Sequence, residues 1–243
     1  MRRLFPLFLL LLTPFYSACD NAETEDIPVI IEDIEVGTGP VIQEKDALMV
    51  SYRGMLEDGS VFQTSDDLEP FAFTVGVGNV IEGWDEGLIG MQVGGTRRLT
   101  IPPSKAFGSS GVCRENSCPV PANATVIFEI TVLRRLDTPH VTDELIGTGA
   151  EARAGLLVSF TYIGTLPNGN VFASSQSTGQ VSQMVIGDDV YIPGLEQGII
   201  GMRAGGLRKI IIPPHLGYGE TGYGGIPPWS VLKFRVELTS VAN

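Results

Sequence analysis

The segment Tyr52-Arg-Gly-Met-Leu-Glu-Asp-Gly59 returns about 110 residues later as Tyr162-Ile-Gly-Thr-Leu-Pro-Asn-Gly169. Each copy places Asp-Gly or Asn-Gly between two apolar-rich runs, which is typical of a tight β-hairpin turn. A Val-Phe pair follows each turn, at Val61-Phe62 and at Val171-Phe172. The hairpin and its repeat indicate that the chain holds two copies of one folding unit.

The repetition continues to the end of each copy, with one added residue in the second. Val80-Ile81-Glu-Gly-Trp84-Asp-Glu-Gly87 corresponds to Tyr191-Ile192-Pro-Gly-Leu195-Glu-Gln-Gly198, and Ile101-Pro102-Pro103 returns as Ile212-Pro213-Pro214. Ordered matches of this kind do not arise from composition alone. We therefore divide the chain into a leader (1–19), an acidic tether (20–26), a first domain (27–136), a linker (137–140) and a second domain (141–243).

One segment of each copy has the spacing of a helix, and the rest indicates strands. Apolar residues lie three or four positions apart in one stripe of each copy: Ile81, Trp84, Leu88 and Met91, then Ile192, Leu195, Ile199 and Met202. Each glycine inside these helices costs about 1 kcal/mol relative to alanine, so packing against a sheet must hold them. Strands are predicted over 97–101, 125–133 and 232–238. The expected unit is an α+β fold, a curved antiparallel sheet around one short helix.

The N-terminal residues indicate export rather than a part of the fold. Arg2 and Arg3 precede a short apolar run and then small residues, which is typical of a secretory signal. Cys19 follows Ser17-Ala18 and resembles the lipidated cysteine of bacterial lipoproteins, although Tyr16 departs from the usual aliphatic residue. The prediction is an exported lipoprotein on the periplasmic face of a bacterial membrane. A plain signal peptide with a nearby cleavage site, giving a soluble periplasmic or secreted protein, is the alternative.

The remaining cysteines and the charge narrow the possible partners. Cys113 and Cys118 lie close together in a polar loop, and in an exported protein this spacing favours a disulfide that stiffens the loop. A metal site is the competing interpretation, but neither His140 nor His215 has metal-ligand spacing. The formal net charge of −12 repels phosphate backbones, so nucleic acid is not an expected partner.

Taken together, these motifs resemble the FKBP family of peptidyl-prolyl cis-trans isomerases over about residues 27–243. The resemblance implies a shallow aromatic pocket floored by the tryptophan of the helix. Carried onto the first copy, the residues implied as catalytic are Tyr52, Phe62, Trp84, Phe107 and Phe128, and those implied as substrate-binding are Phe71, Val80, Ile81 and Val120. In the second copy the implied substrate-binding residues are Tyr162, Phe172, Tyr191, Ile192, Leu195, Tyr218, Ile226 and Phe234.

Several positions depart from the family pattern. Gln63 and Ala173 stand where many members carry an aspartate after the pocket phenylalanine. The first copy has Phe107 where the second keeps the tyrosine hydroxyl as Tyr218. The second copy in turn has Leu195 in place of Trp84, and Ser182 in place of Phe71. We therefore expect the first domain to be the more active copy, and the pocket of the second to be wider and less aromatic.

The function implied by the resemblance is isomerisation of proline peptide bonds in exported proteins that are folding. This chemistry requires no cofactor, metal or nucleophile, because an apolar pocket favours the twisted amide. The implied partners are proline-containing polypeptides, and the membrane if Cys19 carries a lipid. The alternative is a non-catalytic chaperone module on the same fold, which the missing aspartates at Gln63 and Ala173 favour.

Overall fold

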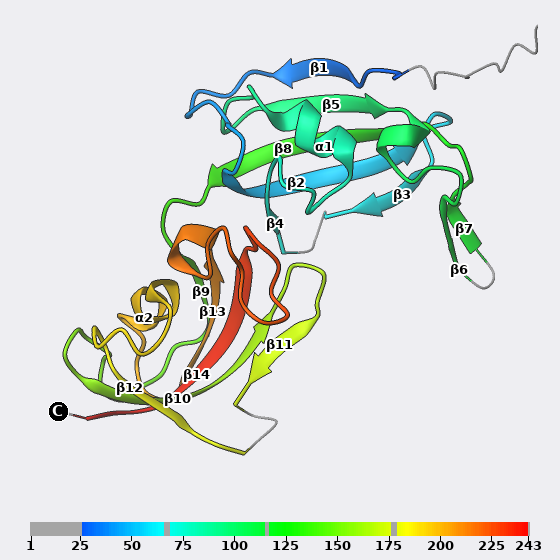
Figure 1. Cartoon of the computed structure of the whole chain (residues 1–243). Helices are drawn as coiled ribbons and strands as arrows, with labels where there is room; N and C mark the ends of the chain where they lie inside the picture. Colours follow the sequence, from blue (N-terminus) through cyan, green and yellow to red (C-terminus); the bar gives the residue numbers. More distant parts are fainter. Residues whose placement is uncertain (1–25, 66–68, 115–116, 176–178, 243) are drawn as a thin grey trace, which may run out of the picture.

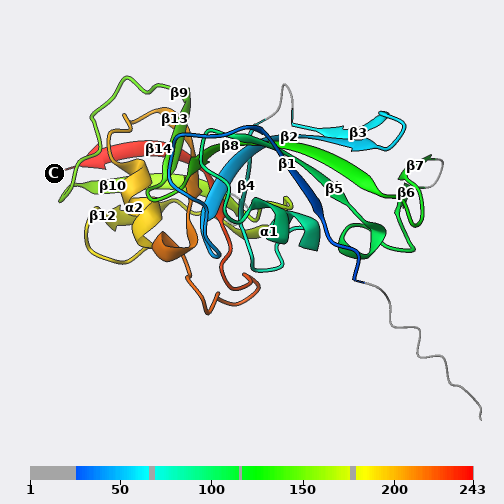
Figure 2. The ribbon, with the colours of Figure 1, turned by 90° about the horizontal axis from the view of Figure 1, so that it is seen from above.

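Each repeat folds into an antiparallel sheet with a short helix on one face (Figures 1 and 2). The computed structural model describes residues 26–65, 69–114, 117–175 and 179–242. The predicted leader, the lipidation site Cys19 and the tether as far as residue 25 lie outside the described residues. The predicted α+β class, with two tandem curved sheets each holding a helix, is confirmed.

The first sheet has the strand order β1-β5-β8-β2-β3, with β4 paired to the other end of β2. Neighbouring strands are all antiparallel. The elements of this domain are β1 (Ile30–Glu35), β2 (Ala47–Leu56), β3 (Val61–Thr64), β4 (Phe71–Thr74), α1 (Glu82–Leu88), β5 (Thr96–Ile101), the 3-10 turn η1 (Pro103–Lys105), β6 (Val112–Arg114), β7 (Ser117–Val120) and β8 (Val126–Arg135).

The second sheet repeats this arrangement in the order β11-β10-β14-β13-β9, with β12 paired to β10. Its elements are β9 (His140–Leu145), β10 (Leu157–Thr165), β11 (Val171–Ser174), β12 (Ser182–Val185), α2 (Pro193–Ile199), β13 (Gly206–Ile212), the 3-10 turn η3 (Pro214–Leu216) and β14 (Leu232–Ala242). The first strand of this domain therefore begins at the last residue of the predicted linker.

The hairpin turns form where the sequence predicts them. Gly59 has a φ of 84° and Gly169 a φ of 88°, in the left-handed region that glycine occupies without strain. The preceding side chain closes each turn: Asp58 Oδ1 accepts a hydrogen bond from the Ser60 N–H at 2.8 Å, and Asn168 does the same for Asn170 at 3.0 Å. These contacts fix the β2–β3 and β10–β11 connections.

The helices are shorter than their apolar stripes. Ile81 is the N-cap of α1 rather than part of it, and Ile89 is already extended with a ψ of 137°. Gly90 follows with a φ of 81°, which turns the chain away from the helix. Trp84 and Leu88 remain on the buried face of α1 and pack into the core of the first sheet. The helix is therefore held by its contact with the sheet.

Candidate functional site

Four aromatic rings from four different elements meet beside α1. Trp84 on α1 lies 5.1 Å from Tyr52 on β2 and 5.1 Å from Phe128 on β8, measured between ring centroids, and both contacts are edge-to-face. Phe71 on β4 packs edge-on against Tyr52 at 6.2 Å. These geometries are the ones that aromatic quadrupoles favour. The rings enclose an open apolar cavity of about 230 Å³.

Most of the residues predicted for the first pocket line this cavity. Those that do are Tyr52, Phe71, Val80, Ile81, Trp84, Phe107 and Phe128. Phe62 stands behind the wall, edge-on to Phe107 at 6.2 Å and to Phe128 at 5.5 Å. Val120 is 1% exposed and belongs to the core of the domain. Phe62 and Val120 therefore support the walls rather than face the cavity.

Two polar residues complete the lining. Gln63 and Asn79 both stand at the exposed rim of the cavity. Gln63 occupies the place of the family's aspartate, so the rim at this point is polar but uncharged. Asn79 was not predicted as a lining residue, and only its position next to Val80 could have indicated it. Because neither side chain is ionised, the cavity lining carries no formal charge at neutral pH.

The floor and the entrance are fixed by different interactions. Trp84 is 4% exposed, and in the described part of the chain its indole Nε1–H has no hydrogen-bond partner, so packing alone positions the ring. Burial raises the pKa of the Tyr52 phenol above its ordinary value. Asp85 accepts hydrogen bonds from the N–H groups of Gly76 and Gly78 at 2.7 and 2.8 Å, and burial raises its pKa. Asp85 thereby holds the loop that leads to Val80 and Ile81.

Ile81 presents its backbone at the edge of the cavity. Its carbonyl accepts hydrogen bonds from the N–H groups of Trp84 and Asp85, which begin α1. Its own N–H donates to no acceptor within the described ranges. A free backbone donor beside an apolar cavity can bind one carbonyl group of a peptide. This is the position where the family resemblance implies a hydrogen bond to the ligand.

The second domain brings together a related but different set of side chains. Tyr162 lies 6.4 Å from Tyr191 and 5.7 Å from Phe234, while Leu195, 1% exposed, takes the place of Trp84. The other residues predicted here, Phe172, Ile192, Tyr218 and Ile226, also pack on this core. Tyr218 stacks on Tyr223 at 5.2 Å.

Sequence reasoning missed one ring of the second domain. Phe160 is fully buried and packs against Tyr162 at 6.0 Å and Tyr191 at 5.4 Å. It occupies the strand position that Val50 holds in the first domain, opposite Ser182 rather than Phe71. Compared with the first domain, the second thus has a larger side chain at this position of β10 and smaller ones at Leu195 and Ser182. Reading Val50 and Phe160 as an aligned pair would have indicated this exchange.

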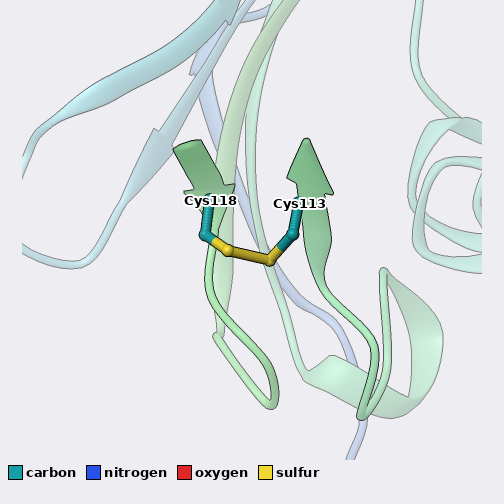
Figure 3. Close-up of a disulfide and its surroundings, with 2 residues drawn as sticks. All are labelled: Cys113 and Cys118. Atoms are coloured by element: carbon teal, nitrogen blue, oxygen red, sulfur yellow. A yellow bond between two sulfur atoms is a disulfide. The ribbon is translucent and has the colours of Figure 1, made fainter. Parts of the chain in front are cut away.

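A disulfide joins Cys113 on β6 to Cys118 on β7 (Figure 3). The two Cα atoms are 4.0 Å apart, and the strands pair at Val112 with Val120. The hairpin follows η1 and Phe107, which lines the aromatic cavity. The bridge therefore closes a short hairpin on the segment that leads away from the pocket.

A larger cavity of about 590 Å³ lies at the domain boundary, outside the aromatic cavity of the first domain. Its lining mixes apolar residues with Lys209, Lys233 and Arg235, and of all the predicted pocket residues it includes only Phe234. Size alone does not identify a proline site. The aromatic lining of the smaller cavity fits a proline ring better.

Comparison with known proteins decides the family. The sequence profile of FKBP-type peptidyl-prolyl cis-trans isomerases matches residues 39–133 and 149–239. The chain belongs to this family. It is therefore a tandem member of a family of enzymes that isomerise proline peptide bonds, and each of its two sheets carries one matched copy.

The family's curated members include relatives that match both domains of this chain. Peptidyl-prolyl cis-trans isomerase FKBP9 of Rattus norvegicus is 36% identical over 208 residues, covering 83% of this chain and 36% of its own length. FKBP10 of Homo sapiens is 39% identical over 209 residues, covering 83% and 35%. The chain thus spans about a third of the length of these relatives. The crystal structure of FkpA from Escherichia coli is 36% identical, covers 43% of this chain and 48% of its own, and has a TM-score of 0.40.

These comparisons leave one expectation without support. The curated relatives reported above are animal proteins, so they give no support to a bacterial lipoprotein. Within the described residues, no helix has the length and apolar character needed to cross a membrane.

Proposed function

We propose that this protein catalyses cis-trans isomerisation of proline peptide bonds in polypeptide clients, and that its first domain carries most of the activity. The observation that carries the proposal is the apolar cavity floored by Trp84 and walled by Tyr52, Phe71 and Phe128. A proline ring has the size and apolar character to enter such a cavity. The second domain lacks the indole floor, because Leu195 stands there.

The proposed mechanism needs only binding and exclusion of water. Rotation about the X–Pro bond meets a barrier of about 18–20 kcal/mol, because amide resonance favours the planar states. The planar amide is more charge-separated than the twisted one, so removing water from it favours the twisted state. Tyr52, Trp84 and Phe128 would supply the dry surface against the proline ring. The rigid walls would bind the twisted geometry better than either planar form.

The free N–H of Ile81 would orient the substrate. A hydrogen bond to a client carbonyl at the cavity edge fixes one side of the proline while the other side rotates. This contact costs the protein little, because in the described structure the N–H has no other partner to lose. Orientation by a single donor also tolerates many client sequences.

The test compares variants of the full chain in a proline-peptide isomerisation assay. Trp84→Leu introduces the residue that the second domain carries, and we expect kcat/KM to fall by about tenfold or more through lost ring contact. Trp84→Phe should retain much of the activity, because the indole N–H makes no hydrogen bond within the described residues. Ile200→Ala, at an exposed residue just after α2, is the control in the second domain and should leave kcat/KM nearly unchanged.

Each outcome decides between the two functions. Full activity in a folded Trp84→Leu variant would place catalysis outside the first pocket. No activity in the wild-type chain, with peptide binding retained, would favour the non-catalytic chaperone module. Circular dichroism of every variant distinguishes loss of the pocket from loss of the fold.

We also propose that the clients are exported proteins. The bridge between Cys113 and Cys118 supports an oxidising compartment, where such bonds persist. Attachment of a lipid at Cys19 remains a prediction. The mass of the N-terminal peptide from the mature protein tests it directly.

A further inference from the structure

The second domain packs directly beside the aromatic pocket of the first. Six buried side chains form one apolar cluster across the boundary: Ala47, Met49, Ala72 and Leu136 from the first domain, and Ile211 and Val231 from the second. None of them is more than 9% exposed. The contact is a small core of its own, because each side chain has exchanged water for apolar neighbours.

Polar contacts fix the segment before β14 against β4. The Thr74 hydroxyl donates a hydrogen bond to the carbonyl oxygen of Trp229 at 2.7 Å, and Asn79 Nδ2 donates to the same oxygen at 3.4 Å. Lys45 Nζ lies 5.2 Å from the centre of the Trp229 ring. Lys209 and Glu69 form an ion pair between the domains. The placement of the second domain beside β4 therefore depends on specific contacts.

A second, smaller cavity of about 140 Å³ opens between the two domains at this point. The β10–β11 turn and the segment before β14 form its far wall, and both lie on the side of the second domain that faces β4 (Figure 1). Its lining residues are Phe71, Phe73 and Asn79 from the first domain, and Leu166, Pro167, Asn168, Pro227, Ser230 and Val231 from the second.

This cavity lies next to the aromatic pocket. Phe71 and Asn79 line both spaces, so the Phe71 ring separates one from the other and Asn79 borders both. An apolar cavity of roughly 150 Å³ is large enough for benzene. The space between the domains therefore matches one branched aliphatic or aromatic side chain. The two spaces share Phe71 and Asn79 as lining residues, so the residue next to a bound proline is the one placed to enter this cavity.

We propose that the second domain supplies a subsite for an apolar side chain that flanks the proline held in the first pocket. Leu166, Pro167 and Pro227 form its wall, and Phe71 is shared with the proline site. The inference rests on the proposed function of the first domain. It assigns the second domain a role in selecting clients that does not depend on whether its own pocket is active.

The test introduces a charge into this wall without altering the first domain. Pro167→Glu is compatible with the hairpin, because Glu57 occupies the same position in the first copy. Asn170→Glu is the matched control, since it adds the same charge to the same turn at an exposed residue that does not line the cavity. Full-length variants are assayed on peptides in which leucine or glutamine is placed at each residue near the proline.

We expect wild type and Asn170→Glu to prefer leucine at one flanking position. In Pro167→Glu that preference should fall about fivefold, because the carboxylate would lose water against an apolar side chain. Equal leucine preferences in the two variants at every position would overturn the proposal. The isomerase activities of the wild type and of Trp84→Leu are measured in parallel. Loss of activity in Trp84→Leu supports the isomerase function even if the subsite is absent.

Discussion

Arg97 is a buried cation, and its neighbours show why it stays there. It is 7% exposed, and its Nε donates a hydrogen bond to Asp33 on β1 at 2.6 Å. Its Nη1 donates to the carbonyl oxygen of Gly87, at the end of α1, at 2.7 Å. Arg208 makes the same contacts in the second domain, with Asp143 at 2.7 Å and Gly198 at 2.9 Å. The pair of arginines therefore ties the helix end to an edge strand in both copies.

Replacing Arg97 should destabilise the first domain without affecting its pocket. Arg97→Met removes a guanidinium that satisfies a carboxylate and buried carbonyls, so we expect the free energy of unfolding to fall by about 3 kcal/mol. Arg98→Met is the control one residue along the strand. Arg98 is only half-buried and pairs with Glu129 and Glu32 near the surface, and its loss should cost less than about 1 kcal/mol. Urea denaturation checks both values, and equal losses would contradict the assignment.

At the scale of elements, the glycines of α1 set how closely the helix approaches the sheet. A Cβ added at Gly87 would lie 2.6 Å from the side chain of Leu99 on β5, and one at Gly83 would lie 2.4 Å from Ile101. The second domain repeats the arrangement at Gly198, where the neighbour is Ile210 at 2.5 Å. Helix propensity alone disfavours glycine here, so close packing must be the reason for it.

Gly87→Ala measures which effect is larger. In an isolated helix the change would stabilise by about 1 kcal/mol. Against Leu99 it overpacks the core, which costs about 1–3 kcal/mol, so we expect net destabilisation. The double variant Gly87→Ala/Leu99→Ala should be more stable than the sum of the two single changes predicts, because the new methyl enters the vacated space. Additive effects in thermal denaturation would show that the two residues do not compete for space.

The repeat and the hairpins could be predicted from the sequence because they depend on local spacing, whereas the residues of the first pocket were implied by the family resemblance. Asp58-Gly59 specifies its own turn, and Trp84 and Leu88 share one helix face whatever surrounds them. The helix ends were less predictable, since Gly90 stops α1 before Met91 although the apolar stripe continues. Phe160 was missed because its size matters through the smaller side chains at Leu195 and Ser182, which are distant in sequence but share its part of the core and its strand pairing.

On the scale of the whole molecule, the contact between the two domains could hardly be predicted from the sequence. Ala47, Leu48, Met49 and Val50 are all buried, because alternate residues of β2 face the core and the second domain. The matching strand of the second domain leaves Leu157 36% exposed. An unbroken apolar run in a strand of an antiparallel sheet is the signal that both faces are covered. What covers it depends on contacts between distant residues.

Trp229, at this boundary, has a backbone conformation that is unfavourable for its side chain but makes contacts with the other domain. It has a φ of 57°, a left-handed conformation that a bulky side chain rarely adopts, and Asn123 holds the same φ at the equivalent place in the first domain. Asparagine adopts this conformation readily. Tryptophan occupies this position although its backbone conformation is unfavourable. Its ring lies near Lys45 across the boundary, while its backbone carbonyl accepts the hydrogen bond from Thr74.

Trp229→Asn should loosen the domains while leaving each fold intact. Asparagine fits the left-handed backbone conformation better than tryptophan does. The variant nevertheless loses the packing of the ring and its cation–π contact with Lys45, which is worth about 0.5–1 kcal/mol when exposed. We expect amide ¹⁵N relaxation to show one tumbling time for both domains of the wild type and two shorter ones in the variant. Lys45→Met is the control that removes only the cation and should have the smaller effect. A single unchanged tumbling time in Trp229→Asn would mean that the apolar cluster around Ala72 and Val231 holds the domains without the ring, and the leucine preference in the isomerisation assay should then also survive.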